Sequence, residues 1–99
     1  MSYFCVVSFD LEGAKASDYD TFYKKLAQIG LNSKLHHVNN SIIDLPSTTV
    51  AGSLTGIDTS EVVSIAENEL KLLYKKLNLK GKYFIFSGAN WAWNGKSVT

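Results

Sequence analysis

Asp10 is the polar residue whose position most suggests chemistry. It follows an apolar run and falls on the more polar of the two faces that a strand there would have, where a carboxylate is costly unless it is solvated, paired or bound to a cation. Across a twofold axis, two such carboxylates could hold one divalent metal, because Mg²⁺ binds carboxylate oxygens and water. The simpler interpretation is a turn residue whose side chain bonds the backbone of residues 11–13. Asp10 is our candidate for both a catalytic and a metal-binding residue.

Lysines near the end of a predicted helix form the second candidate group. Lys71, Lys75 and Lys76 cluster there, and Lys80 follows shortly after. Such a cluster is typical of a solvated face that complements the helix dipole, and less often of a surface that contacts phosphate. We keep Lys71, Lys75 and Lys76 as candidate phosphate contacts.

The charge balance weighs against strong nucleic-acid binding. Ten lysines balance nine acidic residues, arginine is absent, and the formal net charge is +1. Proteins that hold nucleic acid through its phosphates usually carry a basic excess, and arginine is the best bidentate ligand for phosphate and guanine. A local basic patch still fits within a neutral total, so nucleic acid and protein both stay open as partners.

Two tryptophans stand close together near the C-terminus. Trp91 and Trp93 lie on one face if that segment is extended. We predict that they form a hydrophobic clamp over the sheet or over a dimer interface. Two alternatives stay open: a platform on which bases stack, and a hot spot for a partner protein.

The cysteine and the histidines indicate structural roles. Cys5, the only cysteine, lies inside an apolar run and is expected to be a small core residue rather than a nucleophile. One cysteine with no signal peptide or membrane span at the N-terminus favours the cytoplasm. His36 and His37 are adjacent, so on a strand they point to opposite faces and do not form one site.

The elements that must position these side chains follow from the hydrophobic pattern. Residues 3–11 predict a buried strand, and apolar spacing over 17–30 predicts a helix that ends at Gly30. We expect strands near 34–44 and 48–54, with a true hairpin at residues 39–40 and an extra short strand as the alternative. A capping box at Asp58 and Glu61 opens a second helix, and a last strand covers 83–86.

Strand, helix, strand, strand, helix, strand is the order of a ferredoxin-like βαββαβ sandwich. This α+β fold has an antiparallel sheet with two helices on one face. Ninety-nine residues, 45% hydrophobic and 19% charged, predict one globular domain over 1–99. Within it, 88–99 is expected to be a C-terminal extension that covers the sheet or a dimer partner.

Both faces of the sheet are predicted to be covered. The first and last strands are apolar on both faces, whereas a sheet with one face in water alternates more cleanly. Since twofold dimers are the commonest oligomers, we expect a homodimer. Its predicted interface consists of Phe4, Val6, Phe84, Phe86, Trp91 and Trp93.

The first thirty residues resemble a known family. The opening Tyr-Phe-Cys-Val-Val-Ser-Phe-Asp-Leu-Glu over 3–12, then Asp-Tyr-Asp over 18–20 and a helix ending at 29–31, are similar to the CRISPR-associated small adaptation subunit and its relatives outside CRISPR loci. The resemblance implies a ferredoxin-like fold, dimers formed through the sheets, and Asp10 as a metal-proximal aspartate. Some members are metal-dependent nucleases, and others are scaffolds or toxins.

Three functional hypotheses follow. The first is a dimeric interaction module in a toxin, defence or counter-defence system, favoured because no arginine stands near the first helix to hold phosphate. The second is a Mg²⁺-dependent endonuclease that acts through paired Asp10. The third is a small-molecule-binding regulatory dimer. None of the three has a membrane partner.

Overall fold

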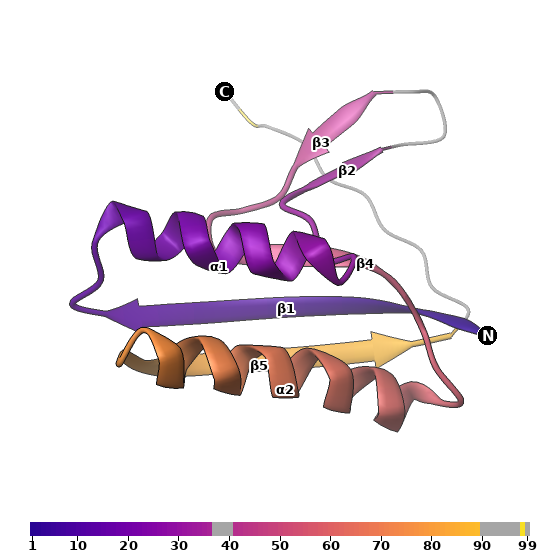
Figure 1. Cartoon of the computed structure of the whole chain (residues 1–99). Helices are drawn as coiled ribbons and strands as arrows, with labels where there is room; N and C mark the ends of the chain where they lie inside the picture. The colour runs from indigo at the N-terminus through magenta and orange to yellow at the C-terminus, as the bar shows by residue number, and fades with distance from the viewer. Residues whose placement is uncertain (37–40, 90–97, 99) are drawn as a thin grey trace.

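A long central strand, β1 (Ser2–Glu12), organises the sheet. In the computed structural model, which describes residues 1–36, 41–89 and 98, β1 pairs antiparallel with β4 (Thr49–Thr55) on one side and with β5 (Lys80–Gly88) on the other (Figure 1). Its aromatic and β-branched residues suit a central strand that is packed on two sides. The sheet order is β4-β1-β5.

Two helices connect these strands. The first, α1 (Ala16–Gln28), follows β1, and the second, α2 (Thr59–Lys76), joins β4 to β5. The predicted cap of α2 is confirmed: the Asp58 carboxylate accepts a hydrogen bond from the Glu61 amide at 2.8 Å. The Glu61 carboxylate in turn accepts from the Ile57 amide at 3.1 Å. These bonds satisfy amide groups that a helix N-terminus leaves without partners.

Both helices end on a residue with left-handed backbone. Gly30 follows α1 with φ +100°, where glycine carries no steric cost. Asn78 follows α2 with φ +53°, and asparagine is among the residues that tolerate this conformation best. The chain therefore turns sharply from the end of α2 into β5.

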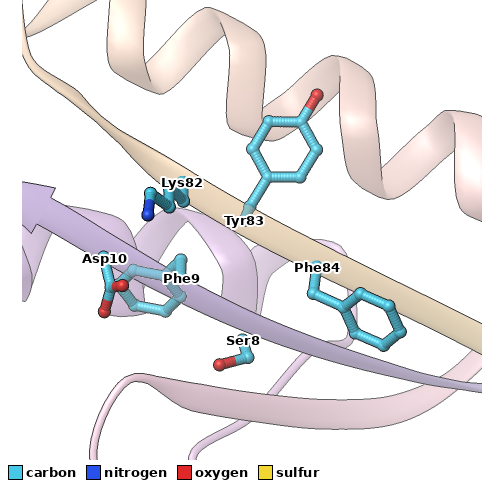
Figure 2. Close-up of a pocket in the computed structure, with 6 residues that line it drawn as sticks. All are labelled: Ser8, Phe9, Asp10, Lys82, Tyr83 and Phe84. Carbon is cyan, nitrogen blue, oxygen red and sulfur yellow. The ribbon is translucent and has the colours of Figure 1, made fainter.

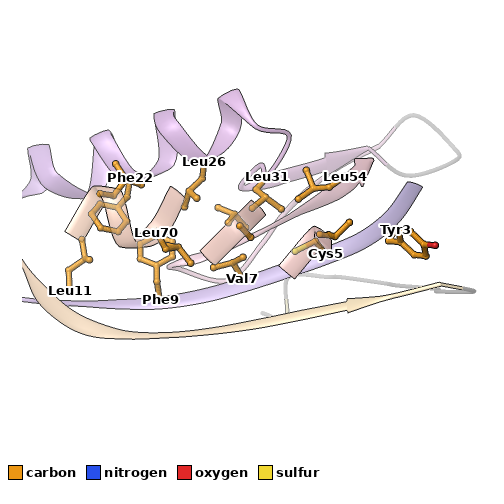
Figure 3. Packing of buried hydrophobic residues seen from close by; sticks show 14 residues of the cluster. Tyr3, Cys5, Val7, Phe9, Leu11, Phe22, Leu26, Leu31, Leu54 and Leu70 are labelled. Atoms are coloured by element: carbon orange, nitrogen blue, oxygen red, sulfur yellow. The ribbon is translucent and has the colours of Figure 1, made fainter. Parts of the chain in front are cut away.

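The core lies between the sheet and the two helices (Figure 3). Alternate β1 residues point into it, from Tyr3 to Leu11, as the period of a strand requires. On α1, Phe22 and Leu26 are fully buried against them. The matching stripe on α2 is buried as predicted and consists of Val62, Ala66, Leu70 and Leu73. The helices therefore cover the same face of the sheet, and the predicted α+β class is confirmed.

The segment between α1 and β4 departs from one continuous strand. It contains two short strands, β2 (Lys34–His36) and β3 (Ile42–Asp44), paired antiparallel as a separate hairpin that projects from the main sheet (Figure 1). This matches the alternative with an extra short strand. Only a bridge between Asn32 and Ala51 extends the main sheet beyond β4 in the described part of the chain. The ferredoxin-like order is thus approximated, with its second strand reduced to that bridge.

Candidate functional site

The sheet face that points away from the helices carries the predicted interface and Asp10. We call it the open face. It consists of the even-numbered residues of β1 and β5 and the β4 residues in register with them: Ser2, Phe4, Val6, Ser8, Asp10, Glu12, Thr49, Ala51, Ser53, Thr55, Lys80, Lys82, Phe84, Phe86 and Gly88.

Two aromatic side chains stand out of the open face. Phe84 is 68% exposed and Phe86 is 59% exposed, and both belong to β5, at one edge of the sheet. Val6, opposite Phe86 on β1, is half-buried, and Phe4 is buried. The other two predicted interface residues, Trp91 and Trp93, lie outside the described residues, as does almost all of the predicted extension 88–99.

Next to the aromatic pair, the open face becomes charged. Asp10 stands directly opposite Lys82 across the β1–β5 ladder, and Glu12 stands opposite Lys80. All four side chains are exposed. The acidic groups therefore line one strand and the basic groups line its neighbour, so this end of the face carries both signs of charge and no net charge.

A shallow pocket of about 240 Å³ joins the charged and aromatic parts (Figure 2). Asp10 and Lys82 line it together with Ser8 and Phe84, whereas the side chain of Tyr83 points the other way, toward α2. Asp10 thus lies on the exposed face, as the sequence predicts. Its single carboxylate faces a cation, not a second carboxylate.

A tyrosine on α2 fixes the backbone at Asp10. The Tyr74 hydroxyl lies 2.7 Å from the Asp10 carbonyl oxygen and 3.1 Å from that of Lys82, and donates to both. Burial, with a smaller contribution from the Asp10 charge, raises the pKa of Tyr74 to about 12. The hydroxyl therefore keeps its proton at neutral pH and holds β1 and β5 together where Asp10 projects.

Gly81, which has no side chain, allows β5 to lie close to the Asp10 carbonyl oxygen. A Cβ atom at Gly81 would lie 1.9 Å from the Asp10 carbonyl oxygen, which no side chain tolerates. Neither Tyr74 nor Gly81 is predicted from the sequence to have a role at this site. For Gly81 the sequence did contain a signal, because a glycine inside a strand often marks close contact with another backbone. The Tyr74 contact spans 64 residues of sequence and left no local signal.

In the described part of the chain, Asp10 does not belong to a cluster of metal-binding side chains. Residues 1–36 and 41–89 contain no group of three or more His, Cys, Asp or Glu side chains arranged to hold an ion. A divalent cation beside Asp10 would also approach the ammonium group opposite it, which opposes binding.

The lysine cluster divides between two grooves. Lys71 and Lys75 line a groove of about 570 Å³ between α2 and β5, together with Lys80. Lys76 lies on another side of α2, in a groove of about 300 Å³ that Lys25 of α1 also lines. The three predicted phosphate contacts therefore do not form one surface.

Cys5 is a core residue, as predicted. Its side chain is fully buried, and burial raises the pKa of the thiol to about 11. The thiol is therefore protonated at neutral pH and a poor nucleophile. His36 is exposed and lines a pocket of about 350 Å³ with Tyr23 and Lys34, whereas His37 lies outside the described residues.

No protein-family model matches the chain, and no curated protein or solved structure matches it either. None of the helices in the described part of the chain is long and apolar enough to cross a membrane.

Proposed function

We propose that this protein is a homodimeric interaction module whose two copies pack through their open faces. The proposal rests on one observation. Phe84 and Phe86 are exposed next to an end of the open face whose positive and negative charges sum to zero. A buried aromatic side chain removes about 150–250 Å² from water, so two exposed ones on each copy are a large driving force for association.

Charge complementarity favours a second copy over a different partner. A twofold interface requires that residue i of one copy meets residue j of the other and the reverse. The open face satisfies this requirement, because Asp10 and Glu12 lie on one strand and Lys80 and Lys82 lie on the next. A twofold axis that runs along the strands, between β1 and β5, sets the acidic groups of each copy against the basic groups of the other.

The area of the open face fits a modest dimer. Strands lie about 4.8 Å apart and rise about 3.4 Å per residue. Three strands of 7, 11 and 9 residues therefore present roughly 450 Å². Two such faces approach the about 1,000 Å² that a specific interface needs. We expect a dimer that dissociates in the micromolar range.

The biological setting of this module remains part of the proposal. The resemblance of residues 3–31 to the CRISPR-associated small adaptation subunit and its relatives supports a toxin, defence or counter-defence system. The buried, unpaired Cys5 agrees with a reducing compartment such as the cytoplasm. We favour binding over hydrolysis, because Asp10 is a lone carboxylate opposite a lysine.

Sedimentation velocity over about 1–100 µM protein tests the proposal, since this range spans the expected dissociation constant. Phe84→Glu places a carboxylate in the interface and should weaken the dimer about 100-fold or more. Leu72→Glu is the matched control, because Leu72 is 63% exposed but lies on α2, away from the open face. It should leave the dimer intact.

Two outcomes would contradict this function. One is a wild-type protein that stays monomeric throughout that range. The other is Mg²⁺-dependent hydrolysis of RNA or DNA that disappears in Asp10→Ala while the dimer persists, which would establish the endonuclease instead.

A further inference from the structure

The groove between α2 and the first half of β5 is separate from the pocket at Asp10 on the open face. Its volume of about 570 Å³ is more than twice that of the pocket at Asp10. The last turns of α2 form one wall and the start of β5 forms the other. The residues that line it are Lys71, Tyr74, Lys75, Asn78, Leu79, Lys80, Gly81 and Tyr83.

The groove carries an excess of positive charge. Three of its lining residues are lysines and none is acidic. The Glu67 carboxylate lies 3.9 Å from the Lys71 ammonium group and offsets that charge. In the described part of the chain, Lys75 and Lys80 form no ion pair. The side chain of Lys80 belongs to the open face, where it stands opposite Glu12. Lys71 and Lys75 lie one turn apart on α2, so these two lysines remain to meet a ligand.

The tyrosines give the groove an aromatic wall rather than a polar one. The Tyr74 hydroxyl is bonded to backbone carbonyl groups, and the Tyr83 hydroxyl donates to Glu67 at 2.6 Å. With both hydroxyls engaged elsewhere, the rings contribute carbon surface, tilted by 34° with centroids 6.3 Å apart. Gly81 adds no side chain to this wall, and the Tyr74 ring lies close to it.

The C-terminal end of α2 repels an anion less strongly than a helix C-terminus with unpaired carbonyl groups does. Exposed carbonyl groups there normally repel negative charge. Here the carbonyl oxygens of Leu73, Tyr74 and Lys75 accept hydrogen bonds from the backbone amides of the following residues 77–79. The turn at Asn78 closes these bonds, and the start of β5 that follows it forms the other wall of the groove.

We infer that this groove binds a nucleoside phosphate. A phosphate group matches Lys71 and Lys75, and a flat base matches the aromatic and aliphatic wall, since bases stack on aromatic side chains. Inorganic phosphate would leave the wall unused, and a nucleoside would leave the lysines unused. Because its walls are α2 and the start of β5, the site does not require the dimer.

Titration of the isotope-labelled protein with adenosine monophosphate, followed by amide chemical shifts, tests the inference. The shifts should centre on Lys75, Asn78 and Gly81, and the dissociation constant should lie below about 1 mM. Adenosine and inorganic phosphate should each bind at least about tenfold more weakly, because each lacks half of the recognised groups.

Two neighbouring lysines provide a matched pair of variants. Lys75→Ala should weaken binding of the nucleotide about tenfold, the loss expected for one charge-assisted contact. Lys76→Ala removes the same charge from the other side of α2 and should change binding less than about twofold. Both side chains are exposed, so both variants should fold, and sedimentation should give the same dimer for both.

Three results would overturn the inference. Equal weakening in the two variants would mean a diffuse charge effect. Equal affinity for phosphate and for the nucleotide would mean an anion patch with no recognition of the base. Binding of oligonucleotides with none of the mononucleotide would mean contacts to a polymer backbone.

Discussion

The same strands form both faces of the central sheet, but one face is buried under the helices and the other is partly exposed. On the face toward the helices, β1 residues such as Cys5, Val7 and Phe9 are at most 1% exposed. One residue along the chain, the side chains point the other way, and on β5 Phe84 and Phe86 remain more than half exposed. The aromatic side chains of Phe84 and Phe86 are thus kept on a face where the structure leaves them exposed among the described residues.

The two faces therefore place different requirements on their residues. The covered face contains no buried polar or charged residue among those that the structure describes, so its residues need only pack. The open face mixes aromatic groups with a balanced set of charges, and neither group stabilises an isolated chain. A face of this composition is suited to a partner surface.

The largest expected effect tests whether the covered face alone carries stability. Phe9→Ala removes a ring that stacks on Phe22 at 5.4 Å and should lower the free energy of unfolding by about 3–5 kcal/mol. Phe84→Ala, on the open face, should cost less than about 1 kcal/mol in the monomer. Urea unfolding at dilute concentrations measures both, and similar losses would mean that the two faces do not differ as we describe.

A smaller effect tests how tightly β1 and β5 approach at the base of the open face. Gly81→Ala forces a methyl group against the Asp10 carbonyl oxygen and should destabilise the protein by about 1–3 kcal/mol. Gly88→Ala is the control, because a Cβ there would meet only the Phe86 ring at 3.5 Å, an ordinary contact. If both variants unfold at the same urea concentration as the wild type, the close approach is not a constraint.

Much of the covered face could be predicted from the sequence, because local rules determine it. Period-two alternation identifies the buried residues of β1, helical spacing identifies the stripe on α2, and Asp58 with Glu61 identifies where α2 begins. The separation of the lysine cluster into two surfaces could also be predicted from the sequence, because consecutive helical residues such as Lys75 and Lys76 point about 100° apart.

The rest depended on contacts between distant segments. The Tyr74 hydroxyl and the Asp10 carbonyl are brought together by the whole fold, and the approach of Gly81 to the same carbonyl depends on strand register. The hairpin of β2 and β3 was ambiguous for a similar reason: two short apolar runs fit one bulged strand as well as two paired strands. Only tertiary packing distinguishes such alternatives.

The smallest expected effect concerns Tyr74, which links the helix layer to the backbone beneath Asp10. Tyr74→Phe removes a hydroxyl that donates to Asp10 and Lys82 and should lower the free energy of unfolding at pH 7 by about 0.5–1.5 kcal/mol. Tyr19→Phe is the control. Its hydroxyl lies 3.4 Å from the Leu11 carbonyl, so its loss should cost less than about 0.5 kcal/mol.

The pH dependence of the stability lost in Tyr74→Phe tests whether the protonated hydroxyl is the cause of that loss. Burial raises the pKa of Tyr74 from 10 to about 12, so the folded protein holds this proton more tightly than the unfolded chain does. The stability that the hydroxyl confers is therefore complete below pH 10 and is lost as the pH rises toward 12. The difference between wild type and Tyr74→Phe should shrink over that interval. A difference that stays constant from pH 8 to 12 would mean that the ring, and not its protonated hydroxyl, joins α2 to the strands.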